Sequence, residues 1–396
     1  MGKLKELITK LCLNGVEFKK IEEFTSFEQP TKYIVKSTKY SDEYKVPVLT
    51  AGQTFVLGYT NEEDGIYNAS KENPVIIFDD FTGAYKWVDF PFKVKSSAMK
   101  IITTNEDKLL IRFLYYMMGF LNFTSNEHKR LWISVYSQMK IAIPPLEVQS
   151  EIVNHLDKYS LLNEKLSNEL SLELIARKKQ FEHYKDELYG FKNKNVEYVK
   201  LKDIAEVIRG GNFQKKDFVE SGKPCIHYGQ IYTKYGSNAN ETFSFISEEN
   251  FNKSKQAQHN DIIMAVTSEN VEDVCKCVVW CGNENVAVSG HIAIIHHSIN
   301  SKYLGYYFST SYFYKTKTKL VHGTKVMEVT PSSLNEILIP VPKLEEQNKI
   351  ADLIEKYEKI YNAIVIEIPK EIEKNQKQYE YYRDKLLSFK EVEVNE

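Results

Sequence analysis

The chain has 396 residues, of which 42% are hydrophobic and 27% are charged, and its 52 basic and 54 acidic side chains give a net charge of −2. This length predicts more than one domain, and the composition is that of an ordinary globular protein. The charge balance argues against a protein that coats nucleic acid indiscriminately, although a local basic face is enough for a specific DNA reader.

No targeting or membrane segment is expected. A run of about 18 apolar residues is missing, so no transmembrane helix is predicted. The opening Met-Gly-Lys-Leu-Lys-Glu lacks the apolar core of a signal peptide, which favours a cytoplasmic protein. Five cysteines in a chain of this size indicate reduced thiols rather than a disulfide framework.

The first part of the chain predicts a mixed α and β domain. Short apolar runs separated by turn residues predict strands at 46–50, 65–67, 74–78 and 92–95. A helix is predicted over 107–121. Pro144 and Pro145 then precede a long helix in which apolar residues recur at steps of three and four, which is typical of a coiled-coil seam.

The second part predicts the same order of elements. Strands are predicted at 261–266, 274–280 and 291–295, and a helix over 302–314. Pro340 and Pro342 precede a second helix with the same apolar spacing. Each long helix has about 40 residues and a length of roughly 60 Å. Pro369 lies inside the second one, where an interior proline costs about 3 kcal/mol, so we expect a kink or a break.

An internal repeat relates the two halves. With a shift of 198 residues, 141–191 aligns without a gap on 339–389, with 17 identities over 51 positions. A shorter match, with a shift of 180, places 16–18 on 196–198. Because neither long helix can bury its apolar stripe alone, we expect the two to pack on each other. If a pseudo-twofold axis relates the half-units, the helices are antiparallel and the variable domains lie at opposite ends of a rod.

The repeated motif resembles the specificity subunit of type I restriction-modification systems. That family has a β-segment ending in Pro, then Leu and Gln, then a conserved helix. The motif occurs here as Ile143-Pro-Pro-Leu-Glu-Val-Gln149 and as Val341-Pro-Lys-Leu-Glu-Glu-Gln347. Four further segments are similar to the family's target-recognition domains: 51–55 and 92–99 in the first half, and 202–213 and 224–231 in the second.

The resemblance implies an α+β fold with two mixed α/β target-recognition domains, separated by two long conserved helices packed as an antiparallel coiled coil in a pseudo-twofold tandem repeat. The expected boundaries are an N-terminal conserved segment 1–15, recognition domain 1 at 16–145, spacer helix 1 at 146–192, recognition domain 2 at 193–342 and spacer helix 2 at 343–390. Each domain would read one half of a bipartite, asymmetric site in double-stranded DNA. The helices would set the spacer and dock two methyltransferase subunits, which endonuclease/translocase subunits would join.

Candidate DNA contacts follow from side-chain chemistry. Arg, Lys, Asn and Gln read base edges, whereas Lys, Ser, Thr and backbone amides hold phosphates. The candidates in domain 1 are Lys36, Thr50, Gln53, Lys71, Lys86, Lys95, Ser96, Ser97 and Lys100. The candidates in domain 2 are Arg209, Asn212, Gln214, Lys215, Lys216, His227, Gln230, Lys234, Thr324 and Lys325. For any one of them the alternative is an ordinary solvated surface residue.

Signals of catalysis are weak, so we expect no enzyme activity, cofactor or metal. Cys275, Cys277 and Cys281 favour core packing, with a zinc site shared with nearby histidines as the minor alternative. Asp79 and Asp80 predict a turn or a strand end rather than a nuclease site. A Walker loop and a methyltransferase motif are both missing. Two alternatives remain open: a degenerate nuclease or methyltransferase, and a coiled-coil adaptor that does not bind DNA.

Overall fold

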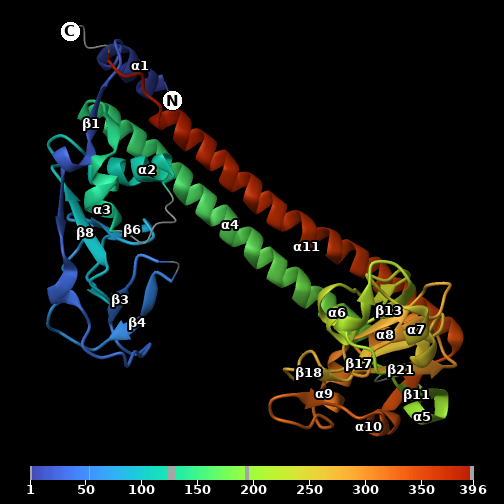
Figure 1. Ribbon diagram of the computed structural model, residues 1–396. Helices are drawn as coiled ribbons and strands as arrows, with labels where there is room; N and C mark the ends of the chain where they lie inside the picture. Colours follow the sequence, from blue (N-terminus) through green and yellow to red (C-terminus); the bar gives the residue numbers. More distant parts are fainter. Residues whose placement is uncertain (1, 53, 124–129, 192–195, 393–396) are drawn as a thin grey trace. The chain divides into compact units, whose positions relative to one another are not determined.

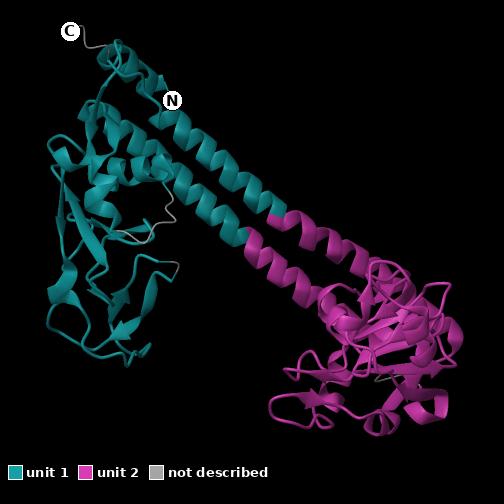
Figure 2. Cartoon of the chain, in the orientation of Figure 1, with its two compact units in different colours: residues 1–169, 370–396 teal, residues 170–369 magenta. Residues whose placement is uncertain are grey.

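The computed structural model describes residues 2–52, 54–123, 130–191 and 196–392. It divides into two compact units, which Figures 1 and 2 show in the same orientation. Unit 1 comprises residues 1–169 and 370–396, and unit 2 comprises residues 170–369. Each unit therefore holds one variable domain and part of both long helices. Within the described ranges, no helix is both long enough and apolar enough to span a lipid bilayer.

Unit 1 is a mixed α/β domain with two cores. Its strands are β1 (Glu17–Lys20), β2 (Thr25–Glu28), β3 (Val46–Leu49), β4 (Val56–Thr60), β5 (Val75–Asp79), β6 (Tyr85–Val88), β7 (Lys93–Val94), β8 (Met99–Thr104) and β9 (Lys140–Ile143). Its short helices are α1 (Gly2–Leu11), α2 (Ile111–Leu121) and α3 (Leu131–Ser134), with 3-10 turns at Ile21–Glu23, Pro30–Tyr33 and Tyr136–Gln138. The sheets have the orders β2-β8-β5-β6, β4-β3-β7 and β1-β9.

The central strand β5 separates the two cores of unit 1. Ile76 and Phe78 belong to the core that contains residues of α2 and the first turns of the long helix. Val75 and Ile77 belong to a second core, which contains residues of β3 and β7. All four side chains are buried, as expected where successive residues of a strand point to opposite faces and both faces are covered.

Unit 2 repeats this plan with a larger sheet. Its strands are β10 (Glu197–Lys200), β11 (Ala205–Arg209), β12 (Phe218–Val219), β13 (Lys223–Ile226), β14 (Asn238–Ala239), β15 (Ser244–Ile246), β16 (Gln256–Ala257), β17 (Ile262–Ala265), β18 (Thr267–Ser268), β19 (Cys277–Trp280), β20 (Val286–Val288), β21 (Ile292–His297), β22 (Met327–Glu328) and β23 (Leu338–Val341). Its short helices are α5 (Leu201–Ile204), α6 (Tyr228–Thr233), α7 (Glu248–Lys253), α8 (Ser301–Tyr307), α9 (Ser311–Lys317) and α10 (Pro331–Asn335), with a 3-10 turn at Lys215–Asp217. The sheets have the orders β11-β21-β17-β19-β14, β12-β15-β13-β20-β16, β10-β23 and β18-β22. Alternate residues of β17 again point into two different cores.

Several predicted elements differ in detail from the structure. The helix predicted from residue 107 begins at Ile111. At its start the N–H of Leu110 donates to the side chain of Gln149, and the N–H of Ile111 donates to that of Glu106. The helix predicted over 302–314 is two helices, α8 and α9, because Thr310 caps the second one. The predicted strand at 65–67 is a turn with one isolated bridge to Phe92.

The two long helices are α4 (Leu146–Leu188) and α11 (Leu344–Leu387). In unit 1 the rings of Tyr159 and Tyr382 stack with centroids 5.9 Å apart. In unit 2 the rings of Tyr184 and Tyr357 stack at 5.0 Å. Each unit has a second such contact: Asn163 donates to Gln376 (2.9 Å) in unit 1, and the rings of Phe181 and Tyr361 stack at 5.2 Å in unit 2. Within each unit, residue numbers therefore rise along one helix as they fall along the other, so the helices pack antiparallel, as predicted. A kink or a break was expected at Pro369; α11 is not broken there, since it stays helical through that residue.

The internal repeat corresponds to a repeated joint between each domain and its helix. In unit 1, β1 pairs antiparallel with β9 so that Glu17 lies opposite Ile143. In unit 2, β10 pairs with β23 so that Glu197 lies opposite Val341. Positions 17 and 197 belong to the short repeat match, and 143 and 341 to the long one. The two matches therefore meet in space, and each pair of strands leads into a long helix.

The repeated glutamine explains why the motif has its spacing. Gln149 is fully buried in the first turn of α4, where its amide donates to the carbonyl oxygens of Lys108 (2.9 Å) and Pro144 (2.8 Å) and accepts from the N–H of Leu110 (3.0 Å). Gln347 repeats this in α11, where it donates to the Pro342 carbonyl (2.8 Å) and accepts from the Asn300 N–H (3.0 Å). The side chain thus satisfies backbone groups that would otherwise be buried without partners.

Candidate nucleic-acid interface

The loop after β11 carries the densest group of sequence-predicted contacts. The N–H groups of Gly210 and Gly211 donate to the carbonyls of Ile292 (2.8 Å) and Val288 (2.9 Å). A Cβ on Gly210 would lie 2.3 Å from a backbone oxygen, so glycine is required by this close approach. The backbone is therefore held tightly against its neighbours. The predicted side chains that follow are all exposed: Asn212, Gln214, Lys215 and Lys216.

A second loop with predicted contacts, which ends at Glu328, is joined to the first by an ion pair. Arg209, at the end of β11, donates to the carbonyl of Gly290 (3.2 Å) and pairs with the carboxylate of Glu328 (3.1 Å). Glu328 in turn exchanges two backbone hydrogen bonds with His322. Residues 323–326, which include Thr324 and Lys325, are exposed. The structure thus brings together two candidate groups that lie more than 100 positions apart in the sequence.

Two of the predicted contacts in unit 2 are buried structural residues. His227 is the N-cap of α6, where its Nδ1 accepts from the N–H of Gly229 (3.2 Å). Burial, with smaller effects from Lys215 and His291, lowers the pKa of His227 to about 4, so the ring is neutral at pH 7. Gln230 completes the cap by accepting from the His227 N–H (3.0 Å). Both side chains support the fold, and we leave them out of the interface.

Lys255 and His291 are further candidate residues for DNA contacts that were not predicted from the sequence. The position of the predicted residue Lys234 is also clear. Lys255 is exposed, and its backbone N lies 2.9 Å from where a Cβ of Gly211 would be. His291 is exposed, with its ring 5.0 Å from that of Tyr228. Lys234 is exposed, with its ammonium 5.3 Å from the ring of Phe243. Only tertiary contacts place Lys255 and His291 near the loop, so no local signal could have identified them.

In unit 1 the structure gathers five of the predicted residues at one sheet end. β3 and β7 run parallel, with Leu49 opposite Val94, and the N–H of Val35 donates to the Val94 carbonyl (3.0 Å). The chain segments that follow these three positions therefore emerge side by side. They carry Lys36, Thr50, Lys95, Ser96 and Ser97, of which Thr50 is half-buried and the others are exposed.

The remaining candidates of unit 1 lie elsewhere. Lys100 is 2% exposed, 3.4 Å from the Asp80 carboxylate and in contact with Gln29, so it is unable to reach DNA in this conformation. Lys71 is exposed in a turn beside a cleft that also contains Arg112. Lys86 is half-buried on β6, paired with Ile77. Gln53 lies outside the described residues.

The groups that suggested catalysis have structural roles. Asp79 accepts the N–H groups of Phe81 and Thr82 and so forms the predicted turn. Cys275, Cys277 and Cys281 pack in or against one hydrophobic core, which confirms the core-packing interpretation. Cys275 itself lies outside β19, with a φ of 67°. Among the described residues, no three His, Cys, Asp or Glu side chains are grouped so that they could hold a metal.

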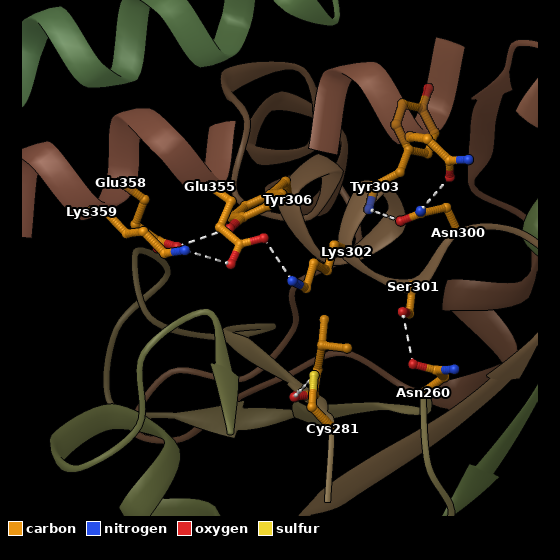
Figure 3. A network of polar contacts seen from close by, with 12 residues as sticks. Asn260, Cys281, Asn300, Ser301, Lys302, Tyr303, Tyr306, Glu355, Glu358 and Lys359 are labelled. Carbon is orange, nitrogen blue, oxygen red and sulfur yellow. Dashed lines mark hydrogen bonds and ion pairs between the residues drawn. The ribbon is translucent and has the colours of Figure 1, made fainter. Parts of the chain in front are cut away.

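Ion pairs at repeat-equivalent positions join each domain to its long helix. In unit 2, Lys302 of α8 contacts the Glu355 carboxylate of α11 at 2.6 Å, as Figure 3 shows. This contact holds the pKa of Glu355 below its usual range. In unit 1, Arg112 of α2 contacts Asp157 of α4 at 2.7 Å. Positions 157 and 355 are related by the same shift of 198, so both domains are anchored to their helices in the same way.

Tyrosines strengthen both anchors. Tyr116 donates to Asp157 (2.5 Å), and Tyr306 donates to Glu358 (2.8 Å), one turn away from Glu355 in the same network (Figure 3). These contacts join charged and polar groups that are partly withdrawn from solvent, where such hydrogen bonds are stronger than at the surface. Each candidate loop is thereby carried by a domain that is held firmly on a long helix.

The fold defines a protein with two different mixed α/β domains, each joined to one of two repeated long helices. The family model described as "Type I restriction modification DNA specificity domain" matches residues 14–172 and again residues 193–374. The specificity subunit of the type I restriction enzyme EcoR124I/EcoR124II from Escherichia coli is 40% identical over 399 residues, covering 96% of this chain and 97% of that protein. The chain belongs to the family of type I restriction-modification specificity subunits.

One further relative agrees with this assignment, and one solved structure agrees with the fold. A putative type I specificity subunit from Haemophilus influenzae is 28% identical over 398 residues, covering 94% of this chain and 96% of that protein. A solved structure from a study of the assembly and conformational transition of the type I R-M system covers 94% of this chain, and this chain covers 97% of it, with a TM-score of 0.66 and 16% identity. At that identity the structure supports the fold alone.

Proposed function

We propose that this chain is the non-catalytic DNA sequence-specificity subunit of a type I restriction-modification complex. Each recognition domain reads one half of a bipartite site in double-stranded DNA. The observation that carries this proposal is the presence of two copies of the DNA-specificity domain with unlike loops in one chain. Because the loops differ, the two half-sites differ, and the full site is asymmetric.

The exposed loops supply the chemistry of both kinds of DNA contact. In unit 2, Asn212 and Gln214 carry the amides that read base edges. Phosphates are held by a larger group in the same unit: Lys215, Lys216, Lys234, Thr324 and Lys325. In unit 1, the group at the end of β3 and β7 has the corresponding role: Lys36, Thr50, Lys95, Ser96 and Ser97. Lys71 and Lys86 contribute phosphate contacts only if DNA extends beyond that group.

The long helices set the spacer between half-sites and dock two methyltransferase subunits, which endonuclease/translocase subunits then join. Large apolar side chains that stay exposed on the helices support a protein partner there. They include Leu162 (62% exposed) and Leu166 (39%) in unit 1, and Leu172 (65%) and Ile360 (60%) in unit 2. Surfaces of this kind are typical of interaction sites.

The proposal is tested by removing phosphate contacts from the assembled complex with its methyltransferase subunits. We expect the Lys215→Gln/Lys216→Gln variant to bind DNA more weakly and to make the negative slope of log K against log salt concentration about 2 less steep, since each phosphate contact contributes about −0.9. The matched control is Lys5→Gln/Lys10→Gln, which removes two exposed charges from α1 and should leave the slope unchanged. Equal slopes for the loop variant and the wild type would contradict the proposed interface.

An adaptor without a DNA role makes a different prediction. Such a protein would leave the complex without salt-dependent, sequence-selective DNA binding. Exchange of residues 193–342 for the matching segment of another member of the family also separates the two functions. We expect that exchange to change one half-site of the methylated sequence and to leave the other unchanged.

A further inference from the structure

We propose that Arg209 and Glu328 form a positioning pair that fixes two loops of unit 2 into one DNA-reading surface. The loop that follows Arg209 is 210–216, and the hairpin that ends at Glu328 is 322–328. Arg209 then acts through the hairpin rather than by touching DNA. This inference rests on the proposed function and concerns how its second recognition domain is built.

The guanidinium of Arg209 already has two protein partners. Its Nε donates to the carbonyl of Gly290 (3.2 Å), and an NH2 group lies 3.1 Å from the carboxylate of Glu328. Gly290 itself packs closely on the first loop, since a Cβ there would lie 2.9 Å from the carbonyl oxygen of Gly211. One side chain thus contacts the segment behind its own loop and the base of the hairpin.

Glu328 lies at the base of the hairpin, so a contact that holds Glu328 in place also restricts the position of the tip. Glu328 and His322 exchange backbone hydrogen bonds of 2.9 and 3.0 Å, and Glu328 also lies opposite Thr267 in the β18–β22 pair. Between His322 and Glu328 the chain turns at Gly323, whose φ of 100° is in the left-handed region. Lys325 lies in the exposed tip. Holding Glu328 therefore limits where Lys325 can be relative to Lys215 and Lys216.

The exposed fractions of Arg209 and Glu328 predict which property of the protein changes when the ion pair is removed. The side chains of Arg209 and Glu328 are 51% and 30% exposed, and exposed ion pairs contribute little to global stability. Loss of the pair should therefore leave the fold intact and loosen both the hairpin and the 210–216 loop, which carries the base-reading amides of Asn212 and Gln214. The expected defect is in sequence discrimination, because base readout depends on loop geometry more than phosphate attraction does.

The test is a double-mutant cycle on the complex with methyltransferase subunits, using Arg209→Gln, Glu328→Gln and both together. The readouts are the ratio of affinities for the methylated motif and for unrelated DNA, and the salt slope. We expect each single variant to lower that ratio about tenfold with the salt slope unchanged, and the double variant to be no worse than either, because contacting residues are not additive. Hydrogen exchange at the amides of His322 and Glu328 should rise in all three.

Other outcomes would overturn the inference. If Arg209 contacts a phosphate, Arg209→Gln makes the negative salt slope less steep by about one, whereas Glu328→Gln frees the guanidinium and strengthens binding. Additive losses, or single variants that discriminate as the wild type does, would also refute a positioning pair. A wild-type complex that shows no discrimination would instead refute the proposed function, so the two failures are distinguishable.

Discussion

The two buried glutamines of the repeat give a prediction in which each half-unit is a control for the other. Replacement of Gln149 by leucine keeps a similar volume and removes three hydrogen bonds, which leaves two carbonyls and one N–H unpaired in the interior. Replacement of Gln347 by leucine removes two hydrogen bonds, those to the Pro342 carbonyl and from the Asn300 N–H. A buried group without a partner costs about 1–3 kcal/mol. At the lower limit, unit 1 loses about 3 kcal/mol and unit 2 about 2 kcal/mol.

Hydrogen exchange followed by mass spectrometry measures this effect for each unit separately, which a single unfolding curve of a chain with two units cannot do. Gln149→Leu should raise exchange at Leu110 and through unit 1, and Gln347→Leu should raise it at Asn300 and through unit 2. The control is Gln180→Leu on the exposed surface of α4, with an expected change within about 0.5 kcal/mol. Unchanged protection around Leu110 in Gln149→Leu would refute the role given to the repeated glutamine.

Three further predictions concern α11, α6 and the spacer. Pro369→Ala should raise the free energy of unfolding by up to about 3 kcal/mol, and with it the melting temperature, because it restores a helical hydrogen bond at an exposed interior position. An unchanged melting temperature would contradict this. The free energy of unfolding should fall as the pH drops from 6.5 towards 4, because His227 is protonated there in the unfolded chain but not in the folded chain, where its pKa is about 4. In His227→Asn, the denaturation midpoint should depend less on pH over this range. A four-residue insertion in both α4 and α11 should change the preferred spacer and leave both half-sites unchanged, as methylation sequencing would show. Altered half-sites with the same spacer would contradict the proposal that the helices set the spacer.

The scaffold could be predicted from the sequence because its signals are local or repeated. The apolar spacing of 146–188 and 344–387 depends on neighbours three and four positions apart, and the prolines before each helix mark its start. The internal repeat supplied the pairing of the helices. Of the kink or break expected at Pro369, the break is absent: an interior proline adds a local free-energy cost, and the 44-residue helix continues through it.

The candidate site was less predictable because it depends on contacts between distant segments. The parallel pairing of β3 with β7 brings Lys36, Thr50 and Lys95 together, and no local pattern specifies a parallel register. Burial also decides between roles for one residue type. Lys100 and Lys95 look alike in the sequence, but Lys100 is paired with Asp80 in the interior, whereas Lys95 is exposed.

The most direct measurement of the central claim is the genomic methylation pattern of cells that express this chain with its methyltransferase subunits. Our account predicts a bipartite, asymmetric motif that disappears when the gene for this chain is deleted and returns when it is restored. Methylation that is unchanged by the deletion would contradict the proposal that this chain selects the DNA sequence.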